Sequence, residues 1–194
     1  MRIIFWGTPE YSVKSLEVLN ESNHDIIAVV SQPDKKRSRG NKLISSPVKE
    51  YANKNNIQVF TPEKIKDNIQ FINKLKELSC DLFMVIAYGK ILPKEILDIP
   101  KYKSWNAHAS LLPRWRGAAP IHWSLLEGDE ITGVGIMKME EGLDTGDVLV
   151  EEQIKIESNE NLKTLTNRLS DLSSKLLLKA VKEIEKNKHR GINH

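Results

Sequence analysis

An amide and an imidazole stand two residues apart in the stretch NAHASLLPRWRGAAPIHW, which runs from Asn106 to Trp123. Residues two apart on a β-strand point to the same face of the sheet, so the side chains of Asn106 and His108 can converge on one atom. An amide N–H and an imidazole suit the oxyanion that develops during attack on a carbonyl carbon, and the imidazole can also move a proton. The spacing therefore indicates an oxyanion-and-proton pair.

An imidazole that works near neutral pH usually needs a carboxylate, which sets its tautomer and raises its pKa. The best candidate is Asp144 in EEGLDTGDV, because a glycine-flanked loop can approach a ligand closely. Each residue also has a structural interpretation. Asn106 can cap a turn, His108 can be a satisfied core histidine, and Asp144 can be a turn aspartate. For an isolated Asn-x-His pair these interpretations are favoured, so the residues alone leave the choice open.

The segments around these residues alternate between strands and helices. Apolar runs at 2–7, 25–31 and 81–88 indicate buried strands, and the third is apolar enough to be central and covered on both faces. Thr8 as an N-cap and Pro9 at the first helical position predict a helix directly after the first strand. These β–α–β units predict a Rossmann-like α/β fold, a mainly parallel sheet with helices on both faces.

Sheets of this kind place their sites at the carboxyl ends of the strands. The loops expected at this common rim are those after residues 6, 31, 87 and 108. Near the end of the chain, the segment from Leu162 to Ile184 predicts a long helix with an apolar stripe on one face. We expect one domain over residues 1–187, followed by a tail over residues 188–194.

Composition and missing motifs exclude several classes of function. The 194 residues are 40% hydrophobic and 28% charged, and the net charge of +3 permits a polyanionic partner without demanding one. The single cysteine excludes an internal disulfide and a cysteine-rich metal site, and it fits a reducing cytoplasm. The sequence has no membrane-length apolar run, no signal-peptide pattern, and no dinucleotide, P-loop, zinc-protease or nucleophile-elbow motif. We therefore expect no metal and no membrane association.

Five longer stretches carry a resemblance to a known family. They are NAHASLLPRWRGAAPIHWSLLEGD, TGVGIMKMEEGLDTGDVL, MRIIFWGTPEYSVKSLEVL, SQPDKKRSRGNKLISSPVK and VIAYGKILP. Together they resemble the signature segments of the methionyl-tRNA formyltransferase family, in the same order and over essentially the whole chain. The resemblance implies the formyltransferase version of the α/β fold. It also implies transfer of a formyl group from 10-formyltetrahydrofolate to the amino group of methionine on initiator methionyl-tRNA.

The resemblance implies roles for particular residues as well. Asn106, His108 and Asp144 match the family's catalytic triplet, which is shared across folate-dependent formyltransferases. Two segments are expected to bind folate, because apolar side chains can flank a flat pterin. They comprise Ser110, Leu111, Leu112 and Pro113, which match the family's folate-binding segment, and a second wall of Ala87, Tyr88, Gly89, Ile91 and Leu92. Leu111 and Leu112 can instead be ordinary core residues.

A dense basic cluster follows the second predicted strand, in QPDKKRSRGNKL. Its five cations lie within eight residues and are Lys35, Lys36, Arg37, Arg39 and Lys42. Such a run is usually a solvated loop, but its place at the rim suits it to grip the phosphates of an RNA acceptor stem. The resemblance implies contact with the tRNA acceptor arm through Arg39, although KKRS replaces the family's usual proline-containing spacer. Arg114 and Arg116 can also meet phosphates, or they can brace acidic side chains.

Two other functions stay open at this point. One is a related formyltransferase that acts on a small amine, such as an amino-sugar nucleotide or glycinamide ribonucleotide. The other is a truncated folate- or RNA-binding module without efficient turnover. The resemblance implies a β-rich C-terminal tRNA-binding domain in full-length members, which this chain is expected to lack. We expect a cytoplasmic monomer, bacterial or organellar, with folate and tRNA as its partners.

Overall fold

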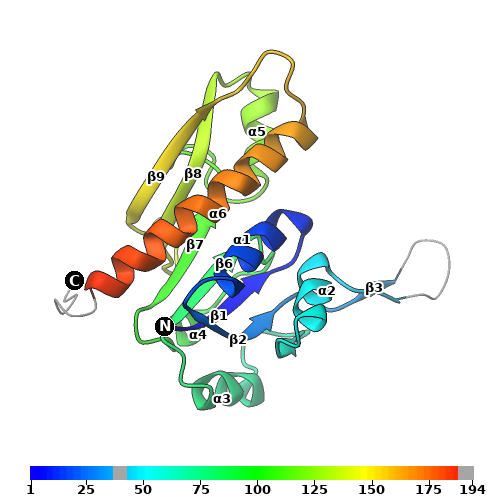
Figure 1. Ribbon diagram of the computed structural model, residues 1–194, viewed down its shortest axis with the longest axis vertical. Coiled ribbons are helices and arrows are strands. Elements are labelled where there is room, and N and C mark those ends of the chain that lie inside the picture. Colours follow the sequence, from blue (N-terminus) through cyan, green and yellow to red (C-terminus); the bar gives the residue numbers. More distant parts are fainter. Residues whose placement is uncertain (37–42, 188–194) are drawn as a thin grey trace.

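The computed structural model describes residues 1–36 and 43–187 and is built around one central sheet (Figure 1). The sheet has seven strands in the order β5-β2-β1-β6-β7-β8-β9. They are β1 (Arg2–Gly7), β2 (Asp25–Val30), β5 (Val59–Phe60), β6 (Leu82–Ile86), β7 (Ser104–His108), β8 (Ile131–Lys138) and β9 (Val148–Lys155). From β5 to β7 all neighbours are parallel, whereas β8 and β9 each run antiparallel to the strand before them. The predicted mainly parallel sheet is confirmed, with an antiparallel pair added at one edge.

Helices cover both faces of this sheet, as predicted. They are α1 (Glu10–Asn20), α2 (Pro47–Lys54), α3 (Ile69–Glu77), α4 (Lys94–Leu97), α5 (Pro120–Leu126) and α6 (Leu162–Asn187). Alternate residues of β1 serve the two faces. Ile3 and Phe5 pack in the core shared with α1, α2 and α6, whereas Ile4 and Trp6 pack in the core shared with α3 and α4. In Figure 1, α6 lies beside α1 along one face. No helix within the described ranges is long and apolar enough to cross a membrane.

The two proline-containing helix starts behave differently. Ser46 caps α2, because its hydroxyl accepts a hydrogen bond from the backbone N–H of Lys49 at 3.1 Å. The expected Thr8 cap of α1 is wrong. The helix begins at Glu10 without a side-chain cap, and the Thr8 hydroxyl instead donates to the carbonyl of Tyr88 at 2.9 Å. Thr8 therefore ties the first strand's exit loop to the loop that follows β6.

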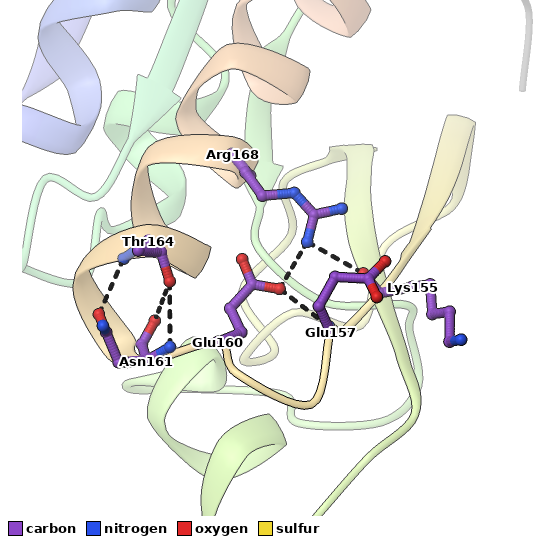
Figure 2. Close-up of polar contacts among 6 residues, drawn as sticks. All are labelled: Lys155, Glu157, Glu160, Asn161, Thr164 and Arg168. Atoms are coloured by element: carbon purple, nitrogen blue, oxygen red, sulfur yellow. Dashed lines mark hydrogen bonds and ion pairs between the residues drawn. The ribbon is translucent and has the colours of Figure 1, made fainter.

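The long helix α6 begins at a network of polar contacts (Figure 2). The Asn161 side chain accepts hydrogen bonds from the backbone N–H groups of Lys163 and Thr164, at 2.9 and 3.1 Å, and so caps the helix. The guanidinium of Arg168 donates to the carboxylate of Glu160 and to the carbonyl of Lys155. These contacts join the end of β9 to the first turns of α6.

The apolar stripe predicted for α6 is buried along most of its length. Its buried members are Leu165, Leu169, Leu172, Leu176, Ala180 and Ile184. The prediction is wrong at the first position only, because Leu162 is 39% exposed. Leu162 belongs to the opening turn, ahead of the point where the helix reaches the sheet.

Candidate active site

The predicted triplet meets at the end of β7. Asn106 and His108 lie on that strand, and Asp144 lies in the loop between β8 and β9. Asn106 Nδ2 lies 3.4 Å from one carboxylate oxygen of Asp144, and His108 Nδ1 lies 3.5 Å from the other. The side chains of His108 and Asp144 are 6% and 13% exposed. The structure thus brings together three polar groups from distant parts of the chain in a mostly covered position.

The second nitrogen of the imidazole has its own partner. His108 Nε2 lies 2.9 Å from the carbonyl oxygen of Trp115. A carbonyl only accepts hydrogen bonds, so we infer that the proton of the neutral ring resides on Nε2. Nδ1 is then the atom that gains or loses a proton, and it faces the Asp144 carboxylate. This is the arrangement expected of an imidazole that exchanges a proton beside a supporting carboxylate.

Asp144 is held by the same loop that holds His108. The backbone N–H of Gly117 donates to its carboxylate at 2.7 Å. Gly117 has φ +91°, a conformation that favours glycine, and a Cβ there would lie 3.1 Å from the Leu143 side chain. Trp115 and Gly117, two residues apart, therefore present one carbonyl to the imidazole and one N–H to the carboxylate.

The backbone around the site is unusually rich in left-handed residues. Ala87, Trp115, Ala119 and Asp144 have φ between 48° and 57°, which non-glycine residues seldom adopt. Such conformations persist where the surrounding structure holds them, and they cluster at functional sites. Ala87, Ala119 and Asp144 all line the cavity described next, which fits a functional role for these conformations.

A cavity of about 610 Å³ opens beside the triplet. This volume lies in the usual range for small-molecule sites, about 300–1,000 Å³. Four segments provide most of its lining: residues 87–92 after β6, 106–109 of β7 and its exit, 117–122 at the start of α5, and 139–144 after β8. Tyr11 and Thr166 complete the wall from α1 and α6. The lining is largely apolar, and its polar side chains include the triplet together with Lys90, His122, Glu140 and Glu141.

The two predicted folate-binding segments have different places in the structure. Ala87, Tyr88, Gly89, Ile91 and Leu92 all line the cavity. Ser110, Leu111, Leu112 and Pro113 do not. The Ser110 hydroxyl donates to the carbonyl of Arg114 at 2.6 Å, and the Leu111 side chain packs over Gly133 of β8. This segment therefore shapes the turn that carries Trp115 and Gly117, and the ordinary packing interpretation fits Leu111.

The other half of the cavity wall was not predicted from the sequence. The missed residues are Met139, Glu140, Glu141, Gly142 and Leu143 after β8, and residues 117–122 before and within α5. The glycine-flanked stretch EEGLDTG was the available signal, but only Asp144 was taken from it. His122 also lines the cavity. Within the described residues, no group of three or more histidine, cysteine or acidic side chains could hold a metal ion.

Tyr88 contributes an apolar surface to this wall. Its side chain is 2% exposed, and its ring packs edge-on against Trp6 with centroids 5.2 Å apart. The hydroxyl has no hydrogen-bond partner within the described part of the chain, and burial raises the pKa of Tyr88 above its usual value. The phenol thus stays protonated at neutral pH, which suits it to packing and not to proton transfer.

The structure describes only two of the five cations in the predicted basic cluster. Lys35 and Lys36 form β3 (Lys35–Lys36), which pairs with β4 (Leu43–Ile44) in a ribbon that projects beyond α2 (Figure 1). Both lysines are exposed. The base of the ribbon is fixed by an ion pair of 2.8 Å between Asp34 and Lys49, and Lys49 holds the pKa of Asp34 below its usual value. The three remaining predicted cations, Arg37, Arg39 and Lys42, lie outside the described residues.

The two arginines after the leucines differ in their surroundings. Arg114 braces an acidic side chain, because its guanidinium donates to both oxygens of Asp129, at 2.6 and 3.0 Å. Of the two interpretations left open by the sequence, the bracing of an acidic side chain therefore holds for Arg114. Arg116 is exposed.

Comparison with known proteins defines the class to which this fold and site belong. A family model described as formyl transferase matches residues 1–181, and the chain belongs to that family. Methionyl-tRNA formyltransferase of Prochlorococcus marinus subsp. pastoris is 82% identical over 193 residues, covering 100% of this chain and 59% of the relative. A protein of the same name from another Prochlorococcus marinus strain is 52% identical, covering 96% and 55%. The chain thus spans less than two thirds of the length of the curated relatives it matches.

Solved structures share the fold at low sequence identity. Phosphoribosylglycinamide formyltransferase from Bacillus halodurans superposes with a TM-score of 0.79 at 20% identity, covering 95% of both chains. A formyltetrahydrofolate deformylase from Pseudomonas syringae pv. tomato gives 0.76 at 17%, covering 96% of this chain and 61% of its own. A sugar 3N-formyl transferase, solved with dTDP and 5-N-formyl-THF, gives 0.70 at 21%, covering 96% and 64%. The formyltransferase version of the α/β fold is therefore confirmed.

Proposed function

We propose that this chain carries out formyl transfer from 10-formyltetrahydrofolate to the amino group of methionine on initiator methionyl-tRNA. The observation that carries the proposal is the convergence of Asn106, His108 and Asp144 on the wall of a ligand-sized cavity. The choice of amine follows the names of relatives up to 82% identical over the whole chain. We assign the activity to residues 1–187, acting as a monomer.

The folate pterin would lie in the cavity between two walls. One wall is the segment from Ala87 to Leu92, and the other is the loop from Met139 to Asp144. Apolar side chains can flank a flat ring, while exposed backbone N–H and C=O groups read its polar edge. In this arrangement Ser110 to Pro113 support the site from behind by holding the following turn.

The triplet divides the work of formyl transfer. The amine nitrogen forms a bond to the formyl carbon, and the bond from that carbon to N10 of the folate breaks. Asn106 Nδ2 and a protonated His108 Nδ1 stabilise the negative charge that develops on the formyl oxygen. Asp144 supports the imidazolium and helps to pass the proton lost by the amine, which ends on N10 of the leaving folate.

The ribbon formed by β3 and β4 supplies positive charge for binding the acceptor tRNA. Lys35 and Lys36 are exposed and project away from the sheet, where they can meet the phosphates of an acceptor arm. We assign the same role to Arg37, Arg39 and Lys42. Reversing both lysine charges, in Lys35→Glu with Lys36→Glu, should raise KM for tRNA and leave folate binding unchanged. Equal loss of both would refute this division.

The decisive experiment compares acceptors. The 194-residue chain is incubated with 10-formyltetrahydrofolate and, separately, with initiator methionyl-tRNA, an amino-sugar nucleotide or glycinamide ribonucleotide. Formylation of the tRNA alone supports the proposal, whereas faster formylation of a small amine overturns it in favour of a small-molecule enzyme. Binding of tetrahydrofolate without turnover of any acceptor identifies a binding module. His108→Ala serves as the inactive control.

A further inference from the structure

The carboxylate of Asp129 lies outside the cavity, yet it holds the loop on which the catalytic pair depends. We propose that Asp129 is a positioning residue that fixes the orientation of the His108 imidazole through the loop from Arg114 to Gly117. The inference deepens the proposed function and rests on it for the role of His108. It assigns a task to a residue that does not line the cavity.

The loop is the shared support of His108 and Asp144. Its Trp115 carbonyl accepts from His108 Nε2 at 2.9 Å, and its Gly117 N–H donates to Asp144 at 2.7 Å. A shift of this loop therefore moves both partners of the pair at once. Their own contact, at 3.5 Å, is too long to hold them without help.

The loop cannot hold this shape by local preference. Trp115 has φ 57° and Gly117 has φ 91°. A bulky residue in the left-handed region is strained, and it stays there only when tertiary contacts hold it. The loop therefore needs an anchor outside itself.

Asp129 provides that anchor through three hydrogen bonds. Its carboxylate accepts from Arg114 Nη2 at 2.6 Å, from Arg114 Nε at 3.0 Å and from the indole N–H of Trp115 at 2.6 Å. The Arg114 guanidinium also lies over the Trp115 ring, 4.2 Å from its centroid, and Trp123 stacks on that ring. One carboxylate thus holds the side chain of the very residue whose carbonyl orients the imidazole.

Asp129 is itself fixed to the end of α5. Its backbone N–H donates to the carbonyl of Ser124 at 2.9 Å, and its side chain is only 12% exposed. Arg114 and the Trp115 indole hold the pKa of Asp129 below its usual value, so it is ionised at neutral pH. The anchor is therefore a charged group tied to the last turn of α5 by a backbone hydrogen bond, and its contacts are all within the chain.

The test compares Asp129→Ala with three further variants of the 194-residue chain: Asp98→Ala, Trp115→Phe and Asp129→Asn. Asp98→Ala is the matched control, because Asp98 also pairs with two cations, Lys94 and Lys103, but lies away from the cavity. Trp115→Phe removes only the indole donor. Two readouts are taken: steady-state formyl transfer, and the ¹⁵N chemical shifts of the His108 ring, which report its tautomer without any acceptor.

In Asp129→Ala we expect kcat to fall by about 10-fold to 100-fold with KM for 10-formyltetrahydrofolate nearly unchanged, as for a small misplacement of a catalytic group. The His108 ring should change from the Nε2–H tautomer to a mixture. Asp129→Asn, which can still accept from the indole, should recover part of both properties. Asp98→Ala should match the parent chain in both readouts.

Several outcomes would overturn the inference. The clearest is an Asp129→Ala chain that folds with unchanged kcat and unchanged ring shifts, or one that only unfolds at lower temperature. If that variant fails to fold, Trp115→Phe decides, and unchanged ring shifts there refute the link. If the parent chain formylates no acceptor, the proposed function fails, but the ring shifts still test the role of Asp129.

Discussion

Two covered carboxylates in this molecule are held in opposite ways. Glu160, beside the start of α6, is 3% exposed and accepts from the Arg168 guanidinium and from the backbone N–H of Glu157 on one oxygen (Figure 2). Asp144, on the cavity wall, is 13% exposed and has its two side-chain neighbours, Asn106 and His108, at 3.4 and 3.5 Å. Glu160 thus has a close, permanently charged partner, whereas the close donor to Asp144 is the backbone N–H of Gly117 at 2.7 Å and its titratable neighbour His108 lies further away.

The difference separates structural polar contacts from contacts available for chemistry. An arginine stays charged at any ordinary pH, so its pair with Glu160 can hold a chain segment but cannot exchange a proton. An imidazole can gain and lose a proton near neutral pH, and a carboxylate beside it stabilises the protonated form. A covered carboxylate beside a basic side chain thus stabilises the fold at Glu160 and is available for proton exchange at Asp144. Mutations at the two sites should separate activity from stability.

The largest effect is expected at the imidazole. His108→Ala removes both the oxyanion partner and the proton carrier, and kcat should fall by about 100-fold to 1,000-fold. Asn106→Ala removes one donor and should cost about 100-fold. Thermal unfolding of both variants should stay close to that of the parent chain, because neither side chain anchors a core. Near-wild-type turnover in either variant would show that the groups beside Asp144 are not catalytic.

A smaller effect on turnover is expected at Asp144. Asp144→Asn keeps the side-chain shape, tolerates the left-handed φ of 50° and can still accept from Gly117. It loses the charge that supports the imidazolium, so kcat should fall by about 10-fold to 100-fold while folding is retained. Steady-state kinetics beside a urea titration checks both halves. A stability loss larger than the activity loss would place Asp144 with Glu160 among structural carboxylates.

The closely paired carboxylate should show the reverse pattern. Arg168→Met leaves the covered Glu160 charge with one backbone donor, and the free energy of unfolding should fall by about 1–3 kcal/mol. Turnover at a temperature where the variant is folded should not change. Lys163→Met, an exposed cation in the first turn of α6, is the matched control and should stay within about 0.5 kcal/mol of the parent chain. Lost turnover in a fully folded Arg168→Met would show that α6 takes part in the chemistry.

Much of the fold was predictable because its elements are encoded locally. The alternation of Ile3, Ile4, Phe5 and Trp6 between two cores follows from the period of a strand, and the leucines of α6 follow from the period of a helix. The triplet was predicted by its spacing on β7 together with the resemblance to a family. In both cases the information lies within a few residues or in a recurring motif.

The rest of the site depends on contacts between distant segments. β8 runs antiparallel to β7, with Trp105 opposite Lys138, so the loop after β8 has to fold back before Asp144 reaches His108. The glycines of that loop indicate a close approach but do not encode its path, so residues 139–143 were not predicted as a cavity wall. For the same reason the predicted helix cap at Thr8 is wrong, because its hydroxyl donates to a carbonyl 80 residues away.

The smallest expected effect concerns pH and a third covered carboxylate. Arg114 and the Trp115 indole lower the pKa of Asp129, so ionised Asp129 stabilises the folded chain. That stabilisation is present above the unfolded pKa, about 3.9, and is lost as the pH falls through the lower folded value. Asp129→Asn should therefore destabilise the chain more at pH 7 than at pH 3, as measured by urea unfolding. A difference that does not change with pH would mean that shape, not charge, accounts for the contacts of Asp129. Asp129 would then differ from Glu160, whose pairing with Arg168 depends on its charge.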